Sequence, residues 1–328
     1  MVGVTVTTDP IGPLAPPPAA PGLPYHRLGR TWPRYRWWKP LLVGLIGAVL
    51  YGLSLLGLFV GLAVAGLFLP ALQAQADEFF TGAAGIDLNN PFHFAVAMGS
   101  IILMLPPLLV ATLLLGAKPL GLLSSVTGRI RWGWLGRCLG LAFGIYVVGY
   151  LGYFSVIALL GEPVRLSFTD PTLPVLLILT LLLVPLQAAT EEYVFRGYLM
   201  QTIGGWLRHP AFAILLPVPL FVLGHTYGLY GQVYVAMFAV VAGWLSWRTG
   251  GLEAAIALHI VNNAVLSALG GVGLLDPNAT DVGVGELIFS VVITAAFVAG
   301  VLILARRGSV SRVSAATTAS YAEARGQH

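Results

Sequence analysis

The chain has 328 residues, of which 57% are hydrophobic and only 9% are Asp, Glu, Lys or Arg. Soluble proteins carry about 25% charged residues, so this composition excludes an ordinary soluble domain and indicates an integral membrane protein. The formal net charge of +4 does not indicate nucleic-acid binding, because the basic residues are spread over short loops rather than gathered on one face.

The fold class follows from the length of the apolar stretches. Stretches of about 20 apolar residues recur, which is the length that a helix needs to cross a hydrocarbon core roughly 30 Å thick. Alternating strand patterns of the barrel type do not recur. A single cysteine, Cys138, excludes an intrachain disulfide and a thiolate metal cluster. The sequence therefore predicts an all-α, polytopic membrane protein with about eight transmembrane helices.

The N-terminal segment differs from the rest of the chain. Residues 1–38 are predicted to form a Pro-rich, disordered cytoplasmic tail, because Pro is frequent and apolar periodicity is weak. The segment lacks the short apolar region and cleavage site of a signal peptide. Basic residues directly precede the first apolar stretch: Arg27, Arg30, Arg34, Arg36 and Lys39.

Each of the following apolar stretches is predicted to be a transmembrane helix: 41–69, 93–116, 133–160, 172–190, 210–225, 228–247, 252–270 and 287–305. Basic and acidic loops alternate between these stretches, so the positive-inside rule predicts that both termini are cytoplasmic. Arg far outnumbers Lys, which is typical of a GC-rich bacterial genome. The predicted location is therefore the plasma membrane of a bacterium. The pairs Gly57/Gly61 and Gly140/Gly144 have a spacing that favours close helix packing.

Charged residues interrupt the apolar sequence after residue 190. Glu191, Glu192 and Arg196 lie at or near membrane depth, where charged side chains turn inward, find partners and mark functional sites. On a helix Glu192 and Arg196 have the spacing and order that favour an ion pair, and Glu191 projects about 100° away. Arg196 is thus predicted to neutralise Glu192. Glu191 is left free to accept a proton from water, as a general base does.

Two later polar groups interrupt apolar stretches in the same half of the chain. His259 and Asn263 share one helix face, and an imidazole beside an amide could hold a developing oxyanion. His225 could help Glu191 to orient a water molecule. Asn262 is an alternative to Asn263, although it points off the His259 face. Each histidine alone is more often a packing residue, but together these groups indicate one site.

Three motifs in a fixed order resemble those of the CAAX protease and bacteriocin-processing (CPBP) family of intramembrane endopeptidases: Glu191-Glu192-x-x-x-Arg196, Phe221-x-x-x-His225 and His259-x-x-x-Asn263. This family includes the Ras-converting type II CAAX proteases. The segment from Gly250 to Ile256 is similar to the usual lead-in of the third motif. The resemblance covers about residues 172 to 270, and the ordered triple is specific.

The resemblance implies an eight-helix membrane protein that cleaves a peptide bond near the cytoplasmic side of the bilayer. Glu191 is then expected to activate water with help from His225, and His259 and Asn263 to stabilise the oxyanion. The pair of Glu192 with Arg196 has a supporting role in this family picture.

A zinc ion is the alternative to a metal-free mechanism. Its ligands would be Glu191, His225 and His259, which leave one coordination position open. The sequence lacks a His-Glu-x-x-His motif, and the asparagine beside His259 is a poor zinc ligand but a good oxyanion donor. These features favour the glutamate mechanism without a cofactor.

The predicted organisation follows from these assignments: transmembrane helices one to three in 39–165, the CAAX-protease-like core in 166–272, the last helix in 273–306 and a cytoplasmic tail in 307–328. The expected partners are the lipid bilayer and a peptide or protein substrate. The sequence leaves open the substrate, any role of prenylation and the oligomeric state.

Two other classes of function compete with a peptidase. Buried Glu and His residues also form the proton relays of coupled transporters. The paired broken helices of two related halves, which are common in such transporters, are not found. A non-catalytic membrane scaffold or immunity protein could keep the same fold and bind a peptide or partner. The intact acids, histidines and asparagine favour retained chemistry.

Overall fold

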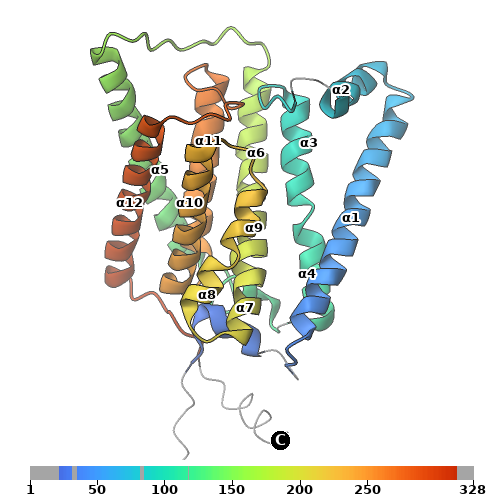
Figure 1. Ribbon diagram of the computed structural model, residues 1–328, viewed down its shortest axis with the longest axis vertical. Helices are drawn as coiled ribbons and strands as arrows, with labels where there is room; N and C mark the ends of the chain where they lie inside the picture. The colour runs from blue at the N-terminus through green and yellow to red at the C-terminus, as the bar shows by residue number, and fades with distance from the viewer. Residues whose placement is uncertain (1–21, 32–34, 82–84, 117, 316–328) are drawn as a thin grey trace, which may run out of the picture.

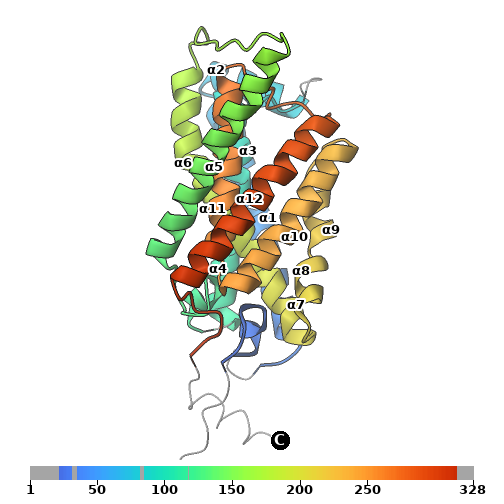
Figure 2. The ribbon, with the colours of Figure 1, turned by 90° about the vertical axis from the view of Figure 1, so that its left-hand side faces the viewer.

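The structure is a computed structural model that describes residues 22–31, 35–81, 85–116 and 118–315. The regular elements of this part of the chain are helical, and the long helices run along one common direction (Figures 1 and 2). The prediction of an all-α, multi-pass membrane protein is confirmed.

Seven helical segments of the described residues have the length and apolar character of a membrane span. They are α1 (Lys39–Gly66), α3 with α4 (Pro91–Ile102 and Leu105–Leu115), α5 (Trp132–Leu159), α6 through α7 (Leu173–Glu192 to Met200–Trp206), α10 (Leu229–Thr249), α11 (Glu253–Gly271) and α12 (Val284–Arg307). Each corresponds to one of the predicted stretches. The shorter helix α2 (Pro70–Thr81) follows α1 at the upper end of the bundle (Figure 1).

The remaining predicted stretch, 210–225, forms two short helices instead of one span. They are α8 (Pro210–Leu215) and α9 (Val218–Leu223). Pro217 lies between them, and a proline has no backbone N–H to continue the hydrogen-bond ladder of α8. Even end to end, residues 210–223 extend only about 21 Å at the rise of an α-helix, against roughly 30 Å of hydrocarbon. The chain then runs without regular structure from Gly224 to Gly228.

The stretch 172–190 extends further than its sequence pattern indicates. Helix α6 continues through a π-helical segment, η3 (Tyr193–Leu199), into α7. Turns of π-helix are rare and are frequent at functional sites. The change from α to π geometry falls directly after the paired glutamates.

Helix α11 lies in the middle of the bundle and packs against α5, α6 and α10 (Figures 1 and 2). Its first two turns are buried, and small alanines at 254, 255 and 257 permit a close approach of the neighbouring helices. Because the third motif begins in these turns, His259 lies in the core of the protein.

An ion pair anchors the start of α11. The guanidinium of Arg131 donates from Nε to Glu253 Oε1 at 2.8 Å and from Nη2 to Glu253 Oε2 at 2.6 Å. Its Nη1 also donates to the carbonyl oxygen of Ser311 at 3.1 Å. Bidentate pairs of this kind are strong and geometrically specific. The pair therefore fixes α11 relative to α5 and to the chain that follows α12.

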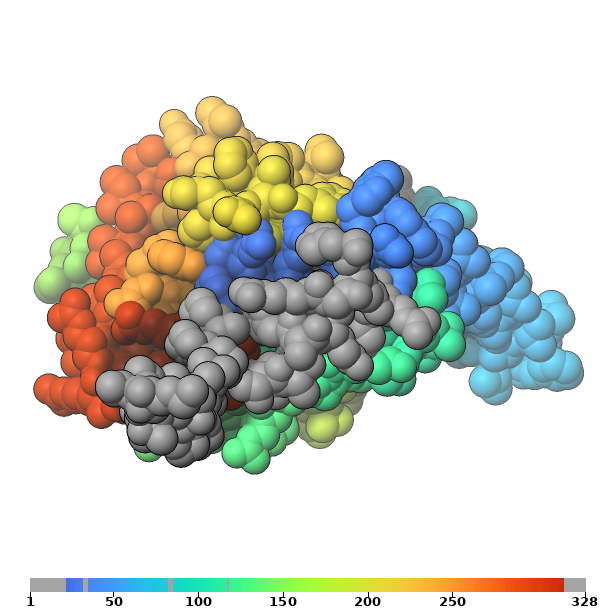
Figure 3. All heavy atoms as spheres, turned by 90° about the horizontal axis from the view of Figure 1, so that it is seen from below, coloured from blue at the N-terminus to red at the C-terminus, as the bar shows by residue number. Residues whose placement is uncertain are grey.

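The prediction of a disordered tail over residues 1–38 is wrong for residues 22–31. These form a 3-10 helix, η1 (Tyr25–Thr31), in which Tyr25 and Leu28 are fully buried. Figure 3 shows this end of the molecule, with the blue N-terminal segment beside the yellow α8. Burial of these side chains offsets part of the backbone entropy of ordering the segment, and the hydrogen bonds of Tyr25, His26 and Arg30 to the bundle add to this stabilisation. Residues 1–21 lie outside the described residues.

The segment after α12 pairs with the segment before η1. Ser314 donates its backbone N–H to the carbonyl oxygen of Leu23 at 2.9 Å, and Leu23 N donates to Ser314 Oγ at 3.0 Å. The first part of the predicted tail 307–328 is thus ordered, whereas residues 316–328 lie outside the described part. The two segments share one end of the bundle, here called the tail end. That this end is cytoplasmic stays a prediction.

The glycine pairs at four-residue spacing do not pack helices together within this chain. Gly57, Gly61, Gly140 and Gly144 are exposed, and a Cβ at any of them would meet no atom within 4 Å. The packing that the sequence predicts for these residues is therefore wrong, because their helix faces point away from the rest of the bundle.

A different glycine is required for packing. Gly204 of α7 lies so close to η1 that a Cβ would overlap the carbonyl oxygen of His26. We expect Gly204→Ala to displace η1 and to destabilise the protein by about 1–3 kcal/mol, the usual cost of overpacking. Thermal unfolding in detergent and proteolysis at residues 22–31 measure the effect. Gly140→Ala on α5 is the matched control, and equal behaviour of the two variants would contradict the prediction.

Candidate functional site

A buried ion pair lies at the centre of the site. Arg196 is 3% exposed and Glu192 is fully buried. Arg196 Nη1 donates to Glu192 Oε1 at 3.0 Å, and Nη2 donates to the carbonyl oxygen of Ala239 on α10 at 3.2 Å. The structure thus forms the ion pair that the sequence predicts. Because Nη2 also reaches α10, Arg196 connects the motif to a second helix.

Aromatic rings surround the guanidinium of Arg196. Its Cζ lies 4.4 Å from the ring centre of Phe221, 5.9 Å from that of Phe195 and 6.0 Å from that of Phe238. The negative faces of aromatic rings stabilise a cation in a site with little water. The ring of Phe221, the first residue of the second motif, therefore contacts the charged residue of the first.

His259 bridges the two glutamates. Its Nδ1 lies 2.9 Å from Glu192 Oε1 and its Nε2 lies 3.5 Å from Glu191 Oε2. Since Glu192 Oε1 also accepts from Arg196, it acts as a carboxylate acceptor and Nδ1 of His259 is the donor. At 3.5 Å the second contact is too long to be a strong hydrogen bond.

Glu191 differs from its neighbour in how its carboxylate is satisfied. Glu191 is 8% exposed, and its Oε2 accepts no hydrogen bond from the part of the chain that the structure describes. Glu192 Oε2 also has no donor there, but Glu192 Oε1 accepts from both Arg196 and His259. Buried carboxylate oxygens usually have a donor, so an oxygen without one marks a position for a ligand or a water molecule. The sequence prediction that one acid is neutralised and the other is left free agrees with this geometry.

His225 lies directly after α9 and its capping residue Gly224. Its Nδ1 donates to the carbonyl oxygen of Phe221 at 2.9 Å, and the two rings are 4.8 Å apart between centres. Because Nδ1 carries the proton, Nε2 of a neutral ring is an acceptor. The ring centre of Phe221 lies in turn 6.4 Å from that of His259. Phe221 is thus the residue that brings the second motif to the third.

The sequence predicts that His225 and Glu191 act on the same water molecule, not that their side chains contact each other. Within residues 118–315 no hydrogen bond joins the two side chains. The role of His225 in orienting a water molecule for Glu191 stays a prediction.

The asparagines of the third motif belong to a chain of hydrogen bonds between side chains. Asn263 Nδ2 donates to Gln187 Oε1 on α6 at 3.1 Å, and Asn262 Nδ2 donates to Asn263 Oδ1 at 2.9 Å. Asn262 Oδ1 accepts from the hydroxyl of Tyr146 on α5 at 2.9 Å and from that of Tyr234 on α10 at 2.7 Å. This chain joins four helices around the site.

Three residues of this network were not predicted from the sequence. Gln187 is a polar residue four positions before Glu191 in an apolar stretch, and that spacing could have identified it. Tyr146 and Tyr234 lie on distant helices among many other tyrosines, so their sequence carries no comparable signal. Asn262 does not replace Asn263 but holds it, because it faces the tyrosines instead of the histidine.

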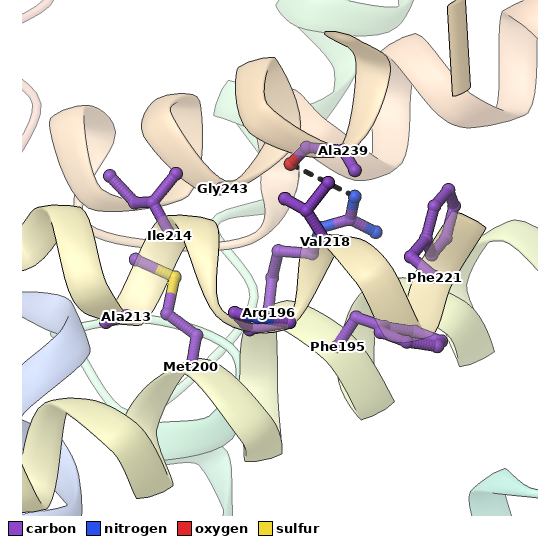
Figure 4. A pocket seen from close by; sticks show the side chains of 10 residues that line it. Phe195, Arg196, Met200, Ala213, Ile214, Val218, Phe221, Ala239 and Gly243 are labelled. Atoms are coloured by element: carbon purple, nitrogen blue, oxygen red, sulfur yellow. Dashed lines mark hydrogen bonds between the residues drawn. The ribbon is translucent and has the colours of Figure 1, made fainter. Parts of the chain in front are cut away.

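A cavity lies behind the ion pair, as Figure 4 shows. The space is small, about 10 Å³ or room for one water molecule, and it lies between α7, the α8–α9 segment and α10. Arg196 and Phe221 form part of its wall, and the remaining lining is apolar, including Met200, Ile214 and Val218. Glu191 and the two histidines do not line it. The cavity is therefore separate from the unpartnered oxygen of Glu191.

The donor set does not fit the zinc alternative. No group of three or more His, Cys, Asp or Glu side chains in the described ranges is arranged to hold a metal ion. Of the three ligands that zinc would require, His259 has its Nδ1 on Glu192 and its Nε2 facing Glu191, whereas the ring of His225 packs against Phe221.

The chain is similar to known proteins over the segment that contains these motifs. Residues 172–265 match the family model of the type II CAAX prenyl endopeptidases that are Rce1-like. The uncharacterised protein YyaK of Bacillus subtilis (strain 168) is 31% identical over 98 residues, which cover 28% of this chain and 33% of YyaK. No solved structure matches the chain.

The matched segment contains all three motifs, from Glu191 to Asn263. Residues 172–265 are therefore similar to the Rce1-like type II CAAX prenyl endopeptidases, in agreement with the resemblance of the ordered motifs.

Proposed function

We propose that the protein is an intramembrane endopeptidase that hydrolyses a peptide bond of a membrane-associated protein or peptide. The observation that carries this proposal is the unpartnered oxygen of buried Glu191 beside His259. A buried carboxylate without a donor is costly to a fold and is useful to a general base.

Glu191 acts as the base in this proposal. Its carboxylate takes a proton from a water molecule, and the water oxygen attacks the carbonyl carbon of the scissile peptide bond. The carbonyl oxygen becomes an oxyanion in a tetrahedral intermediate. The proton held by Glu191 then passes to the leaving nitrogen as the C–N bond breaks. The atoms balance without a metal or a cofactor.

His259 and Asn263 stabilise the oxyanion. One N–H of Asn263 is bound by Gln187, and the second makes no hydrogen bond within the described structure, so it is available to the oxyanion. His259 offers its Nε2 when both ring nitrogens are protonated. Preorganised donors of this kind supply a large share of catalysis in acyl transfer.

The oxyanion role of His259 requires a proton on both ring nitrogens, because Nδ1 already donates to Glu192. Glu191 and Glu192 carry two negative charges, and Arg196 supplies one positive charge. A cationic His259 brings the buried cluster to neutrality, which reduces the cost of placing charges away from water. Glu192 and Arg196 thus support the reacting groups by fixing His259 Nδ1 and balancing the cluster.

His225 assists Glu191 through its free Nε2. The hydrogen bond from Nδ1 to the carbonyl oxygen of Phe221 fixes the tautomer, so Nε2 can accept a hydrogen bond from the attacking water. Because His225 is held at the end of a short helix, its ring has a defined position relative to Phe221 and His259.

The proposal is tested by comparing the processed peptides of cells with and without an intact Glu191. Membranes are prepared from cells that express the wild-type protein and from cells that express Glu191→Gln at the same level, and their membrane peptides are compared by mass spectrometry. We expect at least one processed peptide to be absent, and its precursor to accumulate, in the Glu191→Gln cells.

Glu286→Gln is the matched control, because Glu286 is an exposed acid at the start of α12. Cells with this variant should process every peptide that wild-type cells process. Identical peptide sets from wild-type and Glu191→Gln cells would rule out the proposed endopeptidase.

A further inference from the structure

We propose that Asn262, held by Tyr146 and Tyr234, is a positioning residue that fixes which way the amide of Asn263 points. This inference rests on the proposed function, because it concerns the donor that Asn263 offers to the oxyanion. The three positioning side chains come from α11, α5 and α10, and α5 and α10, which carry no part of the three motifs, would thus help to set the geometry of the reaction.

Two phenol groups fix the orientation of the Asn262 amide. Tyr146 is 3% exposed, and Asn262 Oδ1 is the acceptor for its hydroxyl at 2.9 Å. The hydroxyl of Tyr234 donates to the same oxygen at 2.7 Å. A buried phenol hydroxyl requires an acceptor, and only the oxygen of the amide can accept. Rotating the Asn262 amide would take this acceptor from both hydroxyls.

The direction of Asn262 determines the direction of Asn263. With Oδ1 on the tyrosines, Asn262 turns its Nδ2 to Asn263, where the acceptor Oδ1 lies at 2.9 Å. A reversed Asn263 would place two amide nitrogens against each other, and neither can accept a hydrogen bond. Asn263 therefore turns its Nδ2 towards Gln187 Oε1 at 3.1 Å.

The orientation of Asn263 determines whether a positive or a negative partial charge faces the oxyanion. In the fixed orientation, Asn263 has a second N–H for the developing negative charge. In the reversed orientation, it would present a carbonyl oxygen to that charge. Loss of one oxyanion donor lowers kcat by about 10²–10³-fold in an acyl-transfer enzyme. Asn262 and the tyrosines thus act on the transition state without touching the substrate.

Asn262→Asp is the sharpest test, because it preserves shape and still accepts from both tyrosines. When ionised, the introduced carboxylate has no donor, so Asn263 must reverse to donate to it. When protonated, the introduced carboxyl group donates its own O–H and restores the wild-type direction. Wild-type Asn262 does not titrate. The groups that face this position are the hydroxyls of Tyr146 and Tyr234 and the amide of Asn263, and the charged cluster of α6 and His259 lies beyond Asn263.

The assay uses purified protein in liposomes and a synthetic, internally quenched copy of the peptide that Glu191→Gln cells fail to process. We expect the kcat of Asn262→Asp to fall by about 10²-fold or more at the alkaline end of the pH profile, with KM within about twofold. Activity should return towards the acid end, where the introduced carboxyl group is protonated. A wild-type kcat throughout the range would overturn the inference.

The double variant Tyr146→Phe/Tyr234→Phe provides a second measurement that introduces no charge. Each single variant leaves one hydroxyl on Asn262 Oδ1, so kcat of the double variant should fall by more than the product of the single effects. Tyr150→Phe, one turn further along α5, is the control, since its hydroxyl has no hydrogen bond in the described structure. Additive effects, or a loss of kcat that follows loss of folded protein, would overturn the inference.

Different outcomes would exclude the proposed function and the positioning role of Asn262. If Glu191→Gln cells lack no processed peptide, the proposed function falls and this inference falls with it. If Glu191→Gln abolishes cleavage but Asn262→Asp cleaves with wild-type kcat, only the positioning role is wrong.

Discussion

Replacing Arg196 by methionine is expected to destabilise the protein by about 3–5 kcal/mol, the usual cost of removing one partner from a buried ion pair. Arg196 is 3% exposed and neutralises the fully buried Glu192. Without the guanidinium, the buried carboxylate of Glu192 loses the positive charge that neutralises it. The hydrogen bond from Arg196 Nη2 to the carbonyl oxygen of Ala239 is lost as well.

Thermal unfolding in detergent, followed by circular dichroism, measures this loss. Arg208→Met is the matched control, because Arg208 is exposed in the connection between α7 and α8, and it should unfold as the wild type does. A midpoint of Arg196→Met equal to that of the control would show that the ion pair carries no stability.

A double variant separates charge from packing. Glu192→Met/Arg196→Met removes both charges of the pair, so that neither is left without its partner. Since apolar residues of similar volume replace many buried ion pairs without loss of stability, the double variant should be more stable than Arg196→Met alone. A double variant that is less stable than the single would indicate that the packing of the arginine stem, and not its charge, matters here.

The fold was predictable from the sequence to the extent that membrane insertion determines it. A run of about 20 apolar residues has few choices other than a transmembrane helix, so the helices around the site lie where the pattern places them. The prediction was wrong for 210–225, which forms the two short helices α8 and α9. Its composition is as apolar as that of a span, but the prolines at 217 and 219 determine its geometry. The hydropathy of a stretch measures how apolar it is, but it does not show where a helix within the stretch ends.

Short-range geometry within the site was also predictable. The pair of Glu192 with Arg196 depends only on four-residue spacing along one helix, and the structure forms it at 3.0 Å. The bridge from His259 to both glutamates was not expected, because it depends on how closely α11 approaches α6. That approach follows from the buried alanines at the start of α11, whose effect appears only when the helices are packed.

The burial of η1 could not be predicted from amino-acid composition. Prolines and a lack of periodicity indicate a disordered tail, yet two apolar side chains in the middle of the segment, Tyr25 and Leu28, find a complementary surface on the bundle. No local signal in a sequence reports a surface that is formed by residues nearly two hundred positions away. His26 Nε2, for example, donates to the carbonyl oxygen of Arg208 at 3.0 Å.

Glu191→Gln is expected to lower kcat by about 10²–10⁴-fold, the contribution of a positioned general base, while leaving the protein as stable as the wild type. Glutamine has the shape of glutamate but cannot take a proton from water at neutral pH. The fold does not depend on the carboxylate, since its Oε2 accepts no hydrogen bond in the described structure. Kinetics of the purified protein in liposomes and its thermal unfolding measure the two quantities.

Glu192→Gln is the informative comparison, because it removes the same charge one residue away. It takes the carboxylate from both Arg196 and His259, so the breaking of the buried pair should cost about 3–5 kcal/mol. The two substitutions are adjacent and chemically identical, but Glu191→Gln should lower turnover and Glu192→Gln should lower stability. If Glu191→Gln instead lost stability and kept its turnover, Glu191 would be the supporting acid, and the assignment of the two glutamates would have to be reversed.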